Sequence, residues 1–150
     1  MRVAQSRQRV PESSPGRLNE RIRQDAERRV TRAAEAGPHA LDARIAELDR
    51  EWDIERAIEA NAATLGLVGL GLGLLVNRRF LALPVVVAGF LLQHAVSGWC
   101  PPVPVLRRLG FRTTGEIDYE RYALKALRGD FCAVRPGRPE GAWRALEAAR

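Results

Sequence analysis

The middle third of this 150-residue chain is almost free of charge, and that limits its fold more than any other feature. From Ala60 to Leu106 the only formally charged residues are Arg78 and Arg79, while the two flanks hold all the others. Both halves of this stretch are apolar on every side, whereas a surface helix of a soluble domain keeps a polar face. Two buried helices of a soluble protein are the alternative, but the flanks offer little apolar surface to cover them. The pattern predicts an all-α membrane protein.

The lengths of the two uncharged stretches suit two membrane-spanning helices. Ala60–Val76 has 17 residues and would extend about 26 Å as a helix, near the lower limit for a span. The second helix should begin at Phe80 and end near Cys100, because prolines follow. The linker between the stretches is so short that the two spans must be antiparallel neighbours. Residues 60–106 are therefore expected to form an antiparallel two-helix transmembrane hairpin.

The segment before the hairpin divides into a tail and a charged helical part. Residues 1–16 contain several prolines and serines and show no apolar pattern, so they are expected to be disordered. Residues 17–59 should be helical, with a first helix that Gly37 ends. A second helix is expected to begin at Pro38, a good first-turn residue, and to continue almost unbroken to Val76.

Residues 107–150, which follow the hairpin, are expected to form a tail with short amphipathic helices. The apolar spacing predicts one helix over 118–128, stopped by Gly129, and another over 139–149. This tail holds ten basic residues against six acids, whereas residues 38–59 hold seven acids against three arginines. The two segments could therefore dock, but exposed ion pairs contribute only about 0–1 kcal/mol each, so docking needs apolar help. We expect that help to come from Leu41, Ile45 and Leu48 against Tyr122, Ala126 and Leu127.

The basic residues beside the hairpin indicate its orientation. The linker carries two arginines and the flanks carry more, so the positive-inside bias places both termini in the cytoplasm. The flanking cations are Arg44, Arg50, Arg56, Arg107, Arg108, Arg112, Arg121 and Lys125. The net charge is +6, and basic flanks beside spans meet anionic lipid, so we expect the lipid bilayer rather than a nucleic acid as partner. Because 23 of the 24 basic residues are arginine, we expect a GC-rich genome and a multi-pass protein of the bacterial inner (cytoplasmic) membrane.

Small residues in the first span are candidates for helix packing. Gly69 and Gly73 are four residues apart, as are Ala62 and Gly66, and such pairs allow helices to approach closely. One interpretation is a dimer interface through Gly66, Gly69 and Gly73. The other is packing against the second span of the same chain, and the sequence leaves both open.

Polar residues near the end of the second span raise the question of chemistry. Gln93, His94 and Ser97 lie within about two turns of Cys100, close to the interface. A hydrogen bond across the hairpin explains them without any reaction, and a proton-relay or ligand role for His94 is the alternative. Cys100 is a candidate thiol, but its activation would require a lowered pKa, with Arg107 or Arg108 as the cation that could help. A packing residue ahead of a helix stop is the simpler interpretation.

The other chemical patterns do not support a site. Cys132 and Arg138 match the Cys-x5-Arg loop of phosphatases and rhodaneses, but no strand pattern precedes Cys132, so we treat the match as coincidence. No Cys–His spacing suggests a metal site, and we expect neither a metal nor a cofactor.

About half of the chain, from Trp52 to Phe131, resembles the YgaP-like inner-membrane domain family. The resemblance rests on Glu51-Trp52-Asp53-Ile54-Glu55-Arg56, on Gly98-Trp99-Cys100-Pro101, on Leu109-Gly110-Phe111 and on the run from Ile117 to Phe131. It implies a two-helix membrane domain that often self-associates. Some relatives carry a fused rhodanese domain that is missing here, so the resemblance implies at most a partnership with thiol or sulfur chemistry, with Cys100 at the matching position.

The function expected from these features is that of a membrane anchor or scaffold without intrinsic catalysis. We expect a homo-oligomer and, as a further partner, a cytoplasmic protein. The alternatives are a thiol or sulfur relay that uses Cys100 and a subunit of an oligomeric pore for small solutes. A pore would require several copies, because two spans cannot line a pathway.

Overall fold

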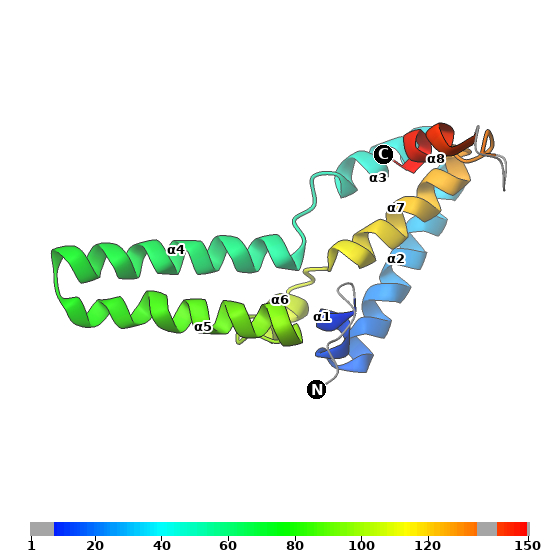
Figure 1. Cartoon of the computed structure of the whole chain (residues 1–150). Helices are drawn as coiled ribbons and strands as arrows, with labels where there is room; N and C mark the ends of the chain where they lie inside the picture. The colour runs from blue at the N-terminus through cyan, green and yellow to red at the C-terminus, as the bar shows by residue number, and fades with distance from the viewer. Residues whose placement is uncertain (1–7, 135–140, 150) are drawn as a thin grey trace. The chain divides into compact units, whose positions relative to one another are not determined.

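The computed structural model describes residues 8–134 and 141–149, and within these ranges all regular structure is helical (Figure 1). The predicted all-α class is therefore confirmed. The elements are α1 (Arg9–Glu12), α2 (Gly16–Ala36), α3 (Pro38–Leu48), α4 (Ile54–Leu75), the 3-10 helix η1 (Arg78–Leu81), α5 (Ala82–Ser97), α6 (Val103–Arg108), α7 (Thr114–Arg128) and α8 (Ala142–Ala149). Two helical stretches, α4 and η1–α5, are long and apolar enough to cross a membrane.

The chain forms two compact units, and each combines segments from both sides of the apolar region. Unit 1 consists of Met1–Ile22 and Trp52–Thr114, and unit 2 of Arg23–Glu51 and Gly115–Arg150. The predicted division followed the charge pattern along the chain, whereas these units describe which segments pack together. Charge shows which segments are in water, but it does not show which of them pack together.

α4 begins at a well-formed cap, so the predicted continuous helix from Pro38 to Val76 is wrong. Asp53 has an extended backbone, and its carboxylate accepts a hydrogen bond from the backbone N–H of Arg56 at 2.7 Å. The backbone N–H of Ile54 donates to the carbonyl of Arg112 at 2.8 Å, a contact that an uninterrupted helix could not make. The chain therefore leaves the helical conformation between α3 and α4.

Two glycines of α4 permit its close contact with the start of α5, and the two helices lie side by side (Figure 1). A Cβ atom on Gly69 would be 2.6 Å from Cδ of Pro84 and 3.0 Å from Cβ of Leu83. A Cβ atom on Gly73 would overlap the side chain of Leu81 in η1. Only glycine fits at these two positions without a shift of the neighbouring chain.

α5 ends earlier than the prolines alone predict. Gly98 has φ of 72° and donates its backbone N–H to the carbonyl of His94 at 2.8 Å, a left-handed cap that stops the helix after Ser97. The expected end near Cys100 is therefore wrong by about a turn. The prolines act at the next element instead, where Pro102 precedes the first turn of α6.

Residues 8–16 differ from the expected disordered tail. They contain α1, and the Val10 side chain is 1% exposed in a cluster with Ile54, Ile58, Cys100 and Val103. One buried valine creates no periodic pattern, so nothing in the linear sequence indicates this contact. Residues 1–7 lie outside the described part of the chain.

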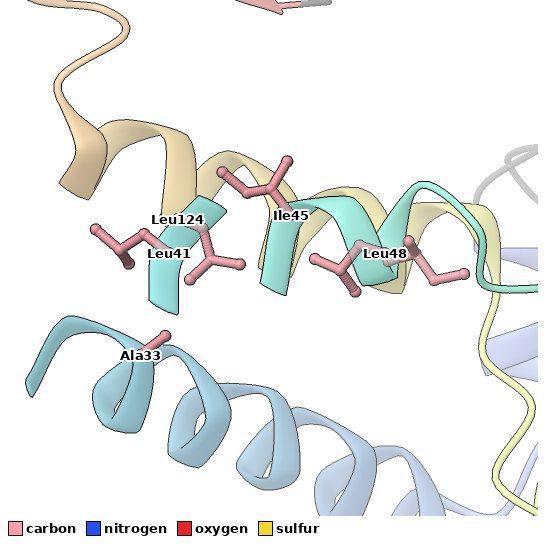
Figure 2. Packing of buried hydrophobic residues seen from close by; sticks show 6 residues of the cluster. Ala33, Leu41, Ile45, Leu48 and Leu124 are labelled. Carbon is pink, nitrogen blue, oxygen red and sulfur yellow. The ribbon is translucent and has the colours of Figure 1, made fainter. Parts of the chain in front are cut away.

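Unit 2 has its own apolar cluster between α2, α3 and α7 (Figure 2). Its members are Ala33, Leu41, Ile45, Leu48, Ile117 and Leu124. The expected docking of the segment after Pro38 onto the tail is observed, and the three residues predicted on α3 are correct. The residues predicted on α7 are wrong, because Tyr122, Ala126 and Leu127 are exposed. The buried face of α7 follows the spacing of Ile117, Glu120 and Leu124 instead.

Candidate functional site

An apolar cavity of about 250 Å³ lies beside the end of the α4–α5 pair that carries Cys100. Ile58 and Leu65 of α4, Phe90 of α5 and the prolines after Cys100 contribute to its lining, and Asn61 adds an amide. At the opposite end of the pair, the glycines bring the helices into tight contact. The arrangement suits an apolar occupant, because the lining offers little to bind a charged group.

Cys100 lines this cavity, but its surroundings oppose thiolate chemistry. The residue is 5% exposed, and burial raises the pKa of the Cys100 thiol. Arg107, the cation expected to help, donates instead to Oδ1 of Asn19 at 2.7 Å and to the carbonyl of Phe111 at 3.3 Å. Arg108 is exposed to solvent. The site therefore favours the neutral thiol and a packing role.

We expect a maleimide to label Cys100 slowly, at a rate that still rises with pH above the ordinary thiol pKa of about 8.5 instead of levelling off there. The thiolate is the reactive form, so a raised pKa moves the rate profile to higher pH. The measurement uses a Cys132→Ser variant over a pH series, with Cys100→Ser as the matched control because Cys132 is exposed. If the labelling rate of Cys100 reached its midpoint at a clearly lower pH than the labelling rate of Cys132, the packing role would be contradicted.

His94 is also buried, yet the structure does not join it to Cys100. The cavity lining does not include His94. No hydrogen bond of standard geometry reaches either ring nitrogen from the described residues. The Ser97 hydroxyl donates to the carbonyl of Gln93 at 2.9 Å within the same helix, so it does not supply the expected bond across the pair.

The structure also shows the surroundings of the three candidate glycines and of Cys132. A Cβ atom on Gly66 would have no neighbour within 4 Å, whereas Gly69 and Gly73 are covered by their own chain. Two of the three candidate glycines thus pack within the chain. Cys132 is exposed after α7, and its partner in the Cys-x5-Arg match, Arg138, lies outside the described residues. Within the described ranges, no three His, Cys, Asp or Glu side chains group as metal ligands.

Unit 2 contains a buried ionic cluster that no sequence pattern described above predicts. The Glu120 side chain is fully buried and accepts hydrogen bonds from Arg29 Nε and Nη2 at 3.1 and 3.0 Å and from Arg44 Nε at 2.8 Å. Two guanidinium groups therefore offset the desolvation of one carboxylate. Burial opposes the charge on Arg44, but its hydrogen bonds to Glu120 and Glu47 prevail and raise its pKa. A charged residue between Ile117 and Leu124 on an apolar face was the signal in the sequence.

Two further ion pairs join α7 to residues 42 and 49, which precede α4. Arg121 Nε lies 3.1 Å from Asp49, and Arg128 Nη1 lies 2.7 Å from Asp42. Each pair is partly exposed, so each contributes less than the Glu120 cluster. Each pair joins a carboxylate of residues 38–59 to an arginine of the tail, the two segments whose net charges are opposite.

No protein-family model matches the chain, and neither a curated protein nor a solved structure shows significant similarity to it. The resemblance to the YgaP-like family therefore stays a prediction.

Proposed function

We propose that the protein is an integral membrane protein in which α4 and η1–α5 form an antiparallel transmembrane hairpin. The exposed apolar surface of these helices carries the proposal. Each helix contains an 18-residue apolar stretch that the rest of the protein leaves largely uncovered. Only 17% of this stretch is buried in α4 and 6% in η1–α5, and Leu75 is 87% exposed. Core helices of a soluble protein would be covered, whereas lipid covers such surfaces in a bilayer. The contacts of Gly69 and Gly73 with residues 81–84 support the antiparallel arrangement.

Unit 2 supports placing both flanks on one side of the membrane. Arg29 and Arg44 precede the apolar region, whereas Glu120 follows it, and all three meet in one cluster. Such hydrogen bonds cannot form across a bilayer about 30 Å thick, so they support a topology in which the chain crosses it an even number of times. With the excess of arginine in the flanks, this favours cytoplasmic termini in a bacterial inner membrane.

Within this topology, the protein acts as an anchor that holds the helical unit 2 at the cytoplasmic face for a protein partner. The proposal includes membership of the YgaP-like family, on the strength of Trp99-Cys100-Pro101 after the second span. It also includes self-association, for which the outward position of Gly66 leaves room. The raised pKa of Cys100 weighs against the thiol relay.

Single-cysteine labelling tests the topology. In a Cys100→Ala, Cys132→Ser background, a membrane-impermeant maleimide applied to spheroplasts should label Asn77→Cys in the linker. It should not reach Ala43→Cys or Glu147→Cys, which are exposed positions of unit 2. Lysis of the spheroplasts should make both accessible, which serves as the control. Labelling of unit 2 from outside the intact spheroplasts would contradict the cytoplasmic orientation.

A further inference from the structure

We infer that α6 lies in the headgroup layer of the bilayer, where it forms an interfacial belt with Trp52 and Trp99 of unit 1. The bilayer is thus a partner of residues outside the two spans. This inference rests on the proposed transmembrane hairpin and adds a second mode of lipid contact to it.

The two faces of α6 are the first observation. Val103 and Arg107, four residues apart, point inward and are each 1% exposed. Val103 packs in the cluster of Ile54 and α1, and Arg107 donates to Asn19. Val105 and Leu109, also four residues apart, point outward and are 57% and 72% exposed. The inner face is covered by protein, whereas the outer face presents Val105 and Leu109 and is uncovered within the described chain.

The aromatic and basic residues around α6 match an interfacial position. Trp99 follows the end of α5 and Trp52 precedes the start of α4, so both mark the same end of the helix pair, and both are exposed. The Arg56 guanidinium lies 4.4 Å from the centre of the Trp52 ring, and Arg108 is exposed beside Leu109. Tryptophan is enriched at the headgroup level, and arginine there reaches lipid phosphates from an apolar stem.

The contact of α6 with α4 fixes how deep α6 lies in the bilayer. At this depth, lipid covers the outer face of α6. Val103 shares a cluster with Ile58, which precedes the uncharged stretch at Ala60 by two residues, about 3 Å along the helix. The headgroup layer of one leaflet is about 5–8 Å thick, so an element held at this point lies within it. The outer face of α6 therefore continues the apolar surface of the two spans.

Depth-dependent quenching of tryptophan fluorescence tests the belt. Each variant of the whole chain keeps or gains a single tryptophan, and all other tryptophans among Trp52, Trp99 and Trp143 are changed to Phe. The variants are reconstituted in phosphatidylcholine–phosphatidylglycerol vesicles. The positions are native Trp99, Leu109→Trp and, as a matched reporter inside the first span, Leu67→Trp, which replaces a side chain that is 70% exposed. The vesicles contain lipids brominated either near the headgroup end or near the far end of the acyl chain.

We expect tryptophan at 99 and 109 to show blue-shifted emission and to lose most intensity with shallow bromines, while tryptophan at 67 loses most with deep bromines. Unquenched emission at 99 and 109, typical of water, with normal quenching at 67 would overturn the belt and leave the hairpin standing. Unquenched emission at 67 would instead overturn the hairpin. Efficient disulfide crosslinking of Leu109→Cys between two copies would assign the outer face of α6 to a second copy, and would also overturn the belt.

Discussion

Replacing Glu120 with alanine is expected to destabilise unit 2 by about 3 kcal/mol, the lower end of the range for breaking a buried ion pair. The change leaves Arg29 and Arg44 beside each other without their common carboxylate, in a position where water reaches them only in part. It also opens a void between Ile117 and Leu124 on the buried face of α7. The lower end applies because the two arginines are 31% and 19% exposed and gain some hydration.

Hydrogen–deuterium exchange of the full-length protein in mild detergent measures this effect. Amides of α3, α7 and the end of α2 should exchange faster in Glu120→Ala, while those of α4 and α5 keep their protection. Glu47→Ala is the matched control, because Glu47 pairs with the same Arg44 at 2.7 Å but is 65% exposed. It should cost no more than about 1 kcal/mol. Equal effects of the two substitutions would contradict the central role of the buried carboxylate.

The second large effect is expected at the glycines between α4 and the start of α5. Gly73→Leu would place a side chain where Leu81 already lies, and Gly69→Leu would do so against Leu83 and Pro84. Overpacking of this kind costs about 1–3 kcal/mol or more, because one helix must move. Both variants should lower the melting temperature in detergent, measured as the loss of the monodisperse peak in size-exclusion chromatography after heating.

Gly66→Leu is the internal control, since it adds the same side chain to the same helix where no neighbour lies within 4 Å. It should leave the melting temperature nearly unchanged. The comparison also separates packing within the chain from self-association. If Gly69→Leu and Gly73→Leu abolished association while the melting temperature stayed constant, the glycines would serve an interface between copies rather than the fold.

Local signals in the sequence predicted much of the helical structure. α2 ends before Gly37 and α7 before Gly129, and both glycines have positive φ, a conformation that side chains disfavour. α3 begins at Pro38 as expected. Such boundaries depend on a few neighbouring residues, so a single sequence is enough to find them. Gly98 is the same type of signal, since it also has positive φ, but the prolines after Cys100 predict a later helix end.

The candidate site was predictable only in its parts. Cys100 could be singled out from its position before a proline, but its burial by Val10 and the engagement of Arg107 with Asn19 join segments more than eighty residues apart. The burial raises the pKa of the Cys100 thiol, and the contact with Asn19 engages the guanidinium of Arg107 elsewhere. The cluster of Arg29, Arg44 and Glu120 likewise has no short spacing that a sequence pattern could reveal.

The sequence by itself determined the helical class, the two stretches apolar enough to cross a membrane and the charged character of both flanks. These properties follow from composition and periodicity, which act residue by residue. Only the tertiary structure decided which partners those helices take: Gly69 and Gly73 against their own chain, Val10 beneath α4, and Glu120 between two distant arginines. The physical reason is that burial and hydrogen bonding depend on what the rest of the chain brings to a side chain, and a linear pattern does not contain that information.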